Sequence, residues 1–370
     1  MTISRTRQAD SQGDRSEPEP LRLIDCDVHH AWRSVQDVFP YLSRYWVSFI
    51  EETGFSGFAD PPYLRAASRM AAGRSTSAPG PPPGSSPEHV RADLVDRHGL
   101  SLAILTGSFS SLAFMPNTDL AVALSRAIND WMVETWLCAD PRFRGSLTVP
   151  LQDPQAAAAE IDRVGDDARI VQVIVPAGSV QPYGRRFYHP VWEACERHGL
   201  AVGVHFGATG VAGATAPTAA GWPSYYIEWQ AGMSQVFQAH VVSLVCEGVF
   251  ERFPGLKVSF IEGGFTWVPH VMWMLDKSWR ELRFEVPWLQ RLPSEYIRDH
   301  VWVTGEPAEG PDDEERLLQV IDMVGARRML VFASDYPFGK IDSPDLAIPR
   351  FPPDLRRRIK VENARELYGL

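Results

Sequence analysis

Eight short apolar runs alternate with helical stretches along most of this 370-residue chain, and this alternation limits the possible folds more than any other feature. The runs are rich in β-branched residues and are bordered by glycine and proline. They comprise an opening run from Leu21 to Val28 and residues 102–106, 146–149, 170–175, 201–205, 257–261, 301–304 and 329–333. Near-continuous apolar strands that alternate with helices predict a parallel sheet covered by helices on its outer side.

The helical stretches supply the other half of the pattern. They are residues 91–98, 119–139, 155–164, 189–198, 234–253, 265–282 and 314–323, and residues 353–367 follow the eighth run. Eight strand–helix units predict an α/β fold, a TIM (β/α)8 barrel that forms a single domain with long loop insertions. A doubly wound open sheet is the alternative, but no Gly-rich phosphate loop follows the first run, as a dinucleotide-binding fold would require.

Two polar segments lie outside this pattern. Residues 1–20 have the composition of a disordered leader, so the predicted barrel occupies residues 21–370. Within the barrel, an irregular aromatic region at 32–63 precedes a Pro/Gly/Ser-rich tract at 72–87. Three consecutive prolines remove backbone donors and fix φ, so this tract is predicted to be a surface loop.

Charge and cysteine content exclude several kinds of partner. The net charge is −10 and no basic cluster stands apart from acidic neighbours, which argues against nucleic acid and anionic membranes. No apolar run is long enough to span a membrane, and no secretory signal opens the chain. The 4 cysteines are widely spaced without a CxxC pair, as is typical of a protein from a reducing cytoplasm.

Ionisable side chains stand where several apolar runs end. The first run ends in Asp27 and His29, the fifth in His205, the sixth in Glu262 and the eighth in Asp335. The active site of a TIM barrel lies at the carboxyl ends of its strands, so these side chains are predicted to converge. Two imidazoles with two or three carboxylates suit Zn²⁺, Mn²⁺ or Fe²⁺. A single strand-end histidine is more often structural, so the convergence carries this prediction.

Ordered motifs along the chain add a family resemblance. They are IDCDVH at 24–29, FYHPVWEA at 187–194 followed by VH at 204–205, GVFERFPGLKV at 248–258, EGG at 262–264, VWVT at 301–304, SDYP at 334–337 and ENARELYG at 362–369. Over residues 21–370 the chain resembles the amidohydrolase superfamily. The resemblance is to the amidohydrolase-related branch that includes aminocarboxymuconate-semialdehyde decarboxylase and the resorcylate-type decarboxylases.

The resemblance implies a role for each strand-end residue. Asp27 and His29 stand at the two positions of the family's HxH metal pair, and His205 stands at its fifth-strand histidine. Asp335 stands at the eighth-strand aspartate, which in this family binds metal and often carries a proton. The implied cofactor is a divalent metal held by these four residues, Zn²⁺ above Mn²⁺ or Fe²⁺, although a barrel without metal stays open.

Three positions depart from the family pattern. Asp27 replaces the first histidine, which keeps a metal ligand at this position but makes it a harder one, a carboxylate in place of an imidazole. Phe338 stands where the branch often has histidine. Glu262 replaces the sixth-strand histidine that acts as acid/base in the decarboxylases. A glutamate can still donate a proton at neutral pH if burial or the neighbouring Asp335 raises its pKa, so Glu262 joins Asp335 as a catalytic candidate.

His240 is a third catalytic candidate. It lies within an apolar helical stretch, 236–250, where a half-buried structural histidine is more common than a residue of the active site. We nevertheless include it among the side chains that could line the pocket.

Together these features predict a metal-dependent, non-oxidative decarboxylase of a small aromatic or unsaturated carboxylic acid, a homodimer by resemblance. Metal-dependent hydrolysis of an amide, lactone or C–C bond uses the same ligands and is the first alternative. The second is a metal-free barrel that acts as a cyclase, an isomerase or a binding protein.

Overall fold

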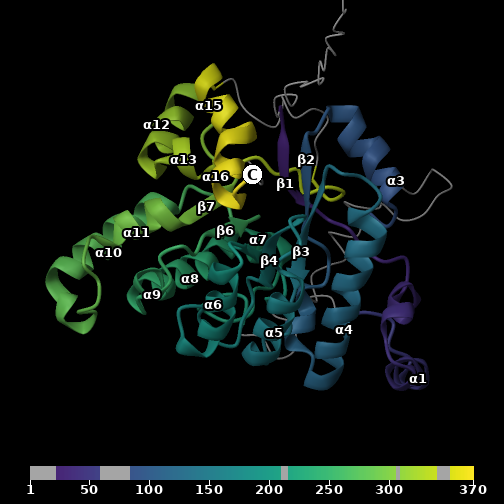
Figure 1. The fold of residues 1–370 in the computed structure, drawn as a ribbon. Coiled ribbons are helices and arrows are strands. Elements are labelled where there is room, and N and C mark those ends of the chain that lie inside the picture. The colour runs from purple at the N-terminus through teal and green to yellow at the C-terminus, as the bar shows by residue number, and fades with distance from the viewer. Residues whose placement is uncertain (1–21, 59–83, 210–215, 306–308, 340–350) are drawn as a thin grey trace, which may run out of the picture.

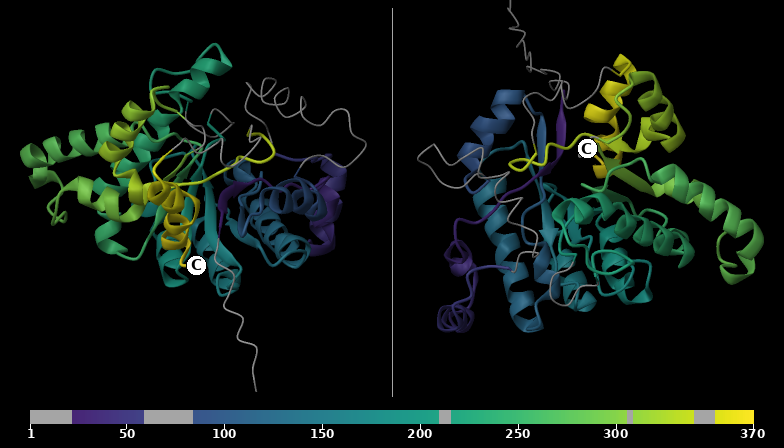
Figure 2. Two further views of the ribbon diagram at one scale, coloured as in Figure 1. Left: turned by 90° about the horizontal axis from the view of Figure 1, so that it is seen from above. Right: turned by 180° about the vertical axis from the view of Figure 1, so that it is seen from behind.

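The structure is a computed structural model that describes residues 22–58, 84–209, 216–305, 309–339 and 351–370. The predicted leader at 1–20 and most of the predicted surface loop at 72–87 lie outside these residues. In the described part of the chain, helices surround a sheet of parallel strands (Figures 1 and 2). No described helix has both the length and the hydropathy needed to cross a membrane.

Eight parallel strands pair in the order of the sequence, which confirms the predicted TIM barrel. The strands are β1 (Ile24–Val28), β2 (Leu102–Leu105), β3 (Phe143–Thr148), β4 (Ile170–Pro176), β5 (Ala201–His205), β6 (Val258–Ile261), β7 (Val301–Thr304) and β8 (Leu330–Val331). Each strand pairs with its successor, so all their carboxyl ends face the same end of the barrel.

Between β8 and β1 the barrel is joined by single hydrogen bonds and by an isolated bridge between Val28 and Tyr336. A strand was predicted over 329–333, but β8 has only 2 residues. Beyond β8, the Cys26 amide donates to the carbonyl of Phe332 (3.0 Å), and a carboxylate oxygen of Asp25 accepts from the Ser334 amide (2.9 Å). Asp25 therefore ties β1 to the segment after β8, and burial raises the pKa of its carboxyl to about 7.

The predicted helical stretches are present, with changes at their ends. The helices at these positions are η2 (Arg91–Asp96), α4 (Thr118–Trp131) with η4 (Met132–Leu137), α5 (Pro154–Val164), α6 (His189–Arg197), α8 (Ser234–Cys246), α9 (Val249–Arg252), α10 (Val268–Leu282), α12 (Glu314–Val324), α15 (Pro353–Arg357) and α16 (Asn363–Tyr368). The helix predicted over 234–253 is broken between α8 and α9, because Gly248 adopts a left-handed backbone conformation (φ 72°).

Several helices of the described residues lie outside the predicted stretches. They are α1 (Arg44–Thr53), α3 (Pro87–Val90), α7 (Tyr226–Gly232), α11 (Pro293–His300) and α13 (Ala326–Met329). In α1 the hydroxyl of Ser43 accepts from the Trp46 amide, and Gly54 ends the helix in the left-handed conformation. Ile50 is buried in this helix, and Trp46 and Phe49 on the same side are partly buried against the core.

The end of the barrel at which the strands begin is filled by side chains and covered by α16. Tyr368 donates from its hydroxyl to the side-chain oxygen of Gln172 (3.1 Å), and the Gln172 amide nitrogen donates to Ser146 (3.0 Å). Gly203 leaves the room that Gln172 needs, since a Cβ there would come within 2.6 Å of that side chain. The amino end of the barrel is thus closed, and ligands must approach from the carboxyl ends of the strands.

Candidate metal centre

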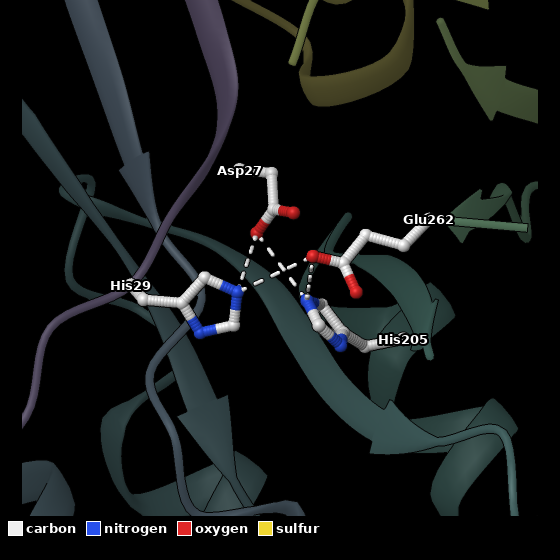
Figure 3. Close-up of side chains that lie close together, drawn as sticks. All are labelled: Asp27, His29, His205 and Glu262. Carbon is white, nitrogen blue, oxygen red and sulfur yellow. Dashed lines mark ion pairs between the residues drawn. The ribbon is translucent and has the colours of Figure 1, made fainter. Parts of the chain in front are cut away.

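Four ionisable side chains converge at the carboxyl ends of three strands. Asp27 lies in β1 and His29 follows it, while His205 ends β5 and Glu262 follows β6. One ligand atom from each lies within 4.8 Å of all the others. Figure 3 shows the four side chains pointing toward one another. Asp335 joins them after β8, with its Oδ1 3.4 Å from His29 Nε2.

The spacing of the donor atoms is that of ligands around one ion. His205 Nε2 lies 3.4 Å from Asp27 Oδ1, and His29 Nε2 lies 3.7 Å from both Asp27 Oδ1 and Glu262 Oε1. Ligands placed about 2.0–2.2 Å from a tetrahedral ion are separated by similar distances. Asp27 is fully buried and both histidines are almost so, so the cluster is shielded from bulk water.

The hydrogen bonds of the two histidines aim their Nε2 atoms at the cluster. The Nδ1 of His29 lies 2.9 Å from the carbonyl of Gly107, and the Nδ1 of His205 lies 2.6 Å from the carbonyl of Phe206. Because a carbonyl only accepts, each Nδ1 carries the hydrogen. Neither Nε2 has a hydrogen-bond partner within the described ranges. Two buried, oriented Nε2 atoms beside carboxylates fit a divalent metal, whose histidine ligands are held in this way.

The charges of the cluster depend strongly on one another. Burial by itself would lower the pKa of His29, but Asp27 and Glu262 raise it to about 9. Burial would raise the pKa of Glu262, yet His205 and His29 lower it to about 2, as does a hydrogen bond from Asp335. Without a metal, Glu262 is therefore a carboxylate at neutral pH, and metal binding must release the proton of His29.

Glu262 and Asp335 share an uncommon backbone conformation. Their φ angles are 61° and 51°, in the left-handed region that residues other than glycine rarely adopt. The Glu262 amide donates to the hydroxyl of Thr304 (3.0 Å), which helps to hold this turn. Such conformations cost free energy and occur mostly at functional sites, where the surrounding structure fixes them.

Two side chains that support the cluster were missed at the level of sequence. The hydroxyl of Thr106 donates to Asp27 Oδ1 (2.6 Å), and one oxygen of Glu309 accepts from the amides of Phe265 and Thr266 (2.7 Å each). Thr106 is the polar last residue of the second predicted run, a signal of the kind that revealed the ligands. Glu309 follows no strand directly, so no such signal existed for it.

His240 lies in α8 and does not line the cavity above the cluster. Its Nε2 lies 2.8 Å from the carbonyl of Ala177, and its Nδ1 accepts from the Tyr183 amide (3.2 Å). The ring stacks on that of Tyr183, with 4.1 Å between centroids. Burial lowers the pKa of His240 to about 4, so the ring is neutral. Both ring nitrogens are hydrogen-bonded to the backbone, and the structure does not bring His240 into the site.

A cavity of about 910 Å³ opens above the cluster. His29, His205, Glu262 and Asp335 contribute to its floor, and loops after several strands form its walls. Aromatic side chains are prominent in these walls, namely Trp32, Phe58, Phe109, Phe206, Tyr226, Trp229 and Phe338. The arrangement can hold a flat organic molecule next to a metal ion.

Comparison with known families agrees with this geometry. The sequence model of the family described as Amidohydrolase matches residues 24–370. The chain belongs to the amidohydrolase family. The resemblance found in the sequence motifs is thereby confirmed.

Within this amidohydrolase family, the similar proteins include named decarboxylases. The gamma-resorcylate decarboxylase of Rhodococcus jostii (strain RHA1) is 26% identical over 271 residues, which cover 69% of this chain and 78% of that protein. The 2-amino-3-carboxymuconate-6-semialdehyde decarboxylase of Dictyostelium discoideum is 24% identical over 300 residues, covering 76% of each chain.

Solved structures show the same fold. The dihydroxybenzoic acid decarboxylase from Polaromonas sp. JS666, solved with bound manganese and the inhibitor 2-nitroresorcinol, has a TM-score of 0.66 and 21% sequence identity. The alignment covers 94% of this chain and 97% of that one. At this identity the similarity establishes the fold of the barrel and no more.

Proposed function

We propose that this chain is a metal-dependent, non-oxidative decarboxylase of an aromatic carboxylic acid. The observation that carries the proposal is the cluster of two oriented imidazoles and three carboxylates at the floor of an aromatic cavity. The decarboxylases among its relatives support the choice of reaction, because they are named for the loss of CO₂ from hydroxylated or unsaturated acids.

Asp27, His29, His205 and Asp335 would hold the metal, with Glu262 beside them. When bound, a divalent ion supplies Lewis acidity, which draws electron density from a carboxylate and an adjacent hydroxyl oxygen. Zn²⁺ is the ion predicted from the sequence, with Mn²⁺ or Fe²⁺ as alternatives. A set of three carboxylates and two imidazoles accommodates Mn²⁺ as well as Zn²⁺, and the Polaromonas relative contains manganese.

The protein's own task is to provide a proton for the carbon that loses CO₂. The C–C bond breaks with its electron pair left on the substrate carbon, and a proton must then reach that carbon. Asp335 is the proposed donor, because its carboxyl group lines the cavity beside His29 and Glu262. Glu262, with its lowered pKa, is the proposed acceptor of the substrate's hydroxyl proton.

Release of CO₂ from hydroxybenzoic acids tests the reaction. The purified protein, supplied with Mn²⁺ or Zn²⁺, is expected to release one CO₂ per molecule of phenol formed. An Asp335→Asn variant serves as the matched control and should release none above background. Hydrolysis products from amide or lactone substrates without any release of CO₂ would contradict the proposal and favour the hydrolase. Turnover that persists without metal would favour a metal-free barrel.

Two further properties are also proposals. We propose a homodimer, by analogy with the family, and a cytoplasmic location, which suits the four cysteines because all of them are free thiols. Sedimentation at micromolar concentration would measure the first, and a monomer would contradict it.

A further inference from the structure

The cavity is large for a substrate with a single ring. Cavities of about 300–1,000 Å³ normally enclose ligands of drug size. The cavity above the cluster, at about 910 Å³, lies near the upper end of this range. A hydroxybenzoic acid with its carboxylate at the cluster would leave most of this volume unfilled. Unfilled space costs the dispersion contacts that its walls would otherwise make.

The walls have two groups of aromatic rings that come from different segments. In the first group, Trp32 lies nearly parallel to Phe58 (18° between planes) and 4.9 Å from Phe109. In the second, Trp229 lies 4.7 Å from Phe206 and 5.4 Å from Tyr226. Flat apolar faces of this kind favour aromatic ligands, and two separate groups offer contacts to more than one ring.

The charge of the walls limits the ligand as well. The described lining residues include neither lysine nor arginine, whereas they include the carboxylates of Glu262, Glu309 and Asp335. A second carboxylate on the substrate, away from the cluster, would be desolvated without a cation to pair with it. The described walls therefore favour a substrate whose remainder carries no second carboxylate.

Two further apolar side chains line the cavity and are exposed. Ile227 is 72% exposed, and Phe338 is 39% exposed, with its ring centroid 5.1 Å from that of His29. Both add apolar surface that an aromatic ligand can contact.

We propose that the substrate is a polycyclic aromatic monocarboxylic acid, with its carboxylate at the cluster and an uncharged remainder of one or more further rings against the aromatic walls. This proposal rests on the proposed decarboxylase function, because the placement of the carboxylate assumes it. It departs from the one-ring dihydroxybenzoates of the curated and structural relatives.

A matched pair of acids tests the number of rings. In 2,6-dihydroxybenzoate and in 1,3-dihydroxy-2-naphthoate the same two hydroxyls flank the carboxylate, and only the second ring differs. Burial of that ring predicts a kcat/KM about 10-fold or more higher for the naphthoate. Equal or lower efficiency for the naphthoate would overturn the proposal. A naphthoate with a second carboxylate on its distal ring is expected to lose this advantage, and full efficiency would overturn the claim of an uncharged remainder.

Binding of the products separates this proposal from the reaction itself. Naphthalene-1,3-diol should quench the tryptophan fluorescence with a Kd about 10-fold lower than that of resorcinol. If no acid releases CO₂ but the diol binds with this preference, the reaction is wrong and the cavity's preference for two rings stands. If CO₂ is released and the two diols bind equally, the reaction stands and the polycyclic substrate is wrong.

A wall variant locates the effect. Trp32→Ala is expected to raise the Kd of naphthalene-1,3-diol about 10-fold and that of resorcinol by less than about 3-fold. Trp273→Ala is the matched control, because Trp273 is 58% exposed on α10 and does not line the cavity. Equal effects of Trp32→Ala on both diols would contradict the assignment of the second ring to this wall.

Discussion

Buried histidines occupy two different regions of this molecule. At the mouth of the barrel, the Nδ1 atoms of His29 and His205 are each hydrogen-bonded to a backbone carbonyl. Their Nε2 atoms have no hydrogen-bond partner among the described residues. In α8, His240 is buried to the same degree, yet peptide groups occupy both of its nitrogens. The nearby charges differ too, since carboxylates surround the first pair and His240 stacks on a tyrosine.

The difference shows that burial does not distinguish a metal ligand from a structural histidine. What distinguishes them is the unused nitrogen and the charge that it faces. The pKa values follow the same division, being raised for His29 and His205 by carboxylates and lowered for His240 by burial. Substitutions of His29 or His205 should therefore change activity and metal content, whereas substitutions of His240 should change the free energy of unfolding.

The largest expected effect is on activity. His205→Ala should lower the rate of decarboxylation about 100-fold or more, because it removes a proposed metal ligand, while the circular dichroism spectrum is unchanged. His240→Ala should keep the rate per folded molecule within about 3-fold of the wild type. Comparable losses of rate in both variants, measured on folded protein, would abolish the distinction between the two regions.

The next effect separates proton transfer from metal binding within the cluster. Glu262→Gln preserves the shape and one oxygen donor, but the side chain can no longer accept a proton. Turnover should fall about 100-fold, while metal content measured by mass spectrometry stays near that of the wild type. A parallel loss of metal and turnover would instead make Glu262 a ligand.

A smaller effect concerns stability. His240→Ala leaves the carbonyl of Ala177 and the amide of Tyr183 without their partners and opens a void against the tyrosine ring. The free energy of unfolding should fall by about 3–5 kcal/mol in denaturant titrations. A loss below about 1 kcal/mol would show that these contacts do little for the fold.

The smallest effect is a pair of opposite pH dependences in metal-free protein. The pKa of His240 is about 4 in the folded state and near 6.5 when unfolded. Its contribution to the free energy of unfolding is therefore complete above pH 6.5 and is lost as pH falls through 4. The pKa of His29 is about 9 when folded, so its contribution is complete below pH 6.5 and lost as pH rises through 9.

Each dependence amounts to about 2–3 kcal/mol and is read by comparison with a variant. Unfolding of the chelator-treated wild type is compared with His240→Gln between pH 7 and 4, and with His29→Gln between pH 6 and 9.5. Each variant should lack the corresponding slope. Slopes of the same sign for the two histidines would contradict the contrast in their surroundings.

The fold and most of the cluster could be predicted from sequence because both depend on local pattern. Asp27, His205 and Glu262 each stand at or next to the end of an apolar run, and the barrel brings such ends together whatever the side chains are. Glu309 was not predictable, because its role depends on a loop contact with a segment more than 40 residues away. His240 was misleading, because an apolar helix says nothing about which groups its histidine meets.

The metal content of the purified protein tests the central claim most directly. We predict about one divalent ion per chain in the wild type and in His240→Ala, and less than about one tenth of an ion in His205→Ala. Substoichiometric metal in active wild-type protein, or full metal content in His205→Ala, would contradict the assignment of the cluster as a metal centre.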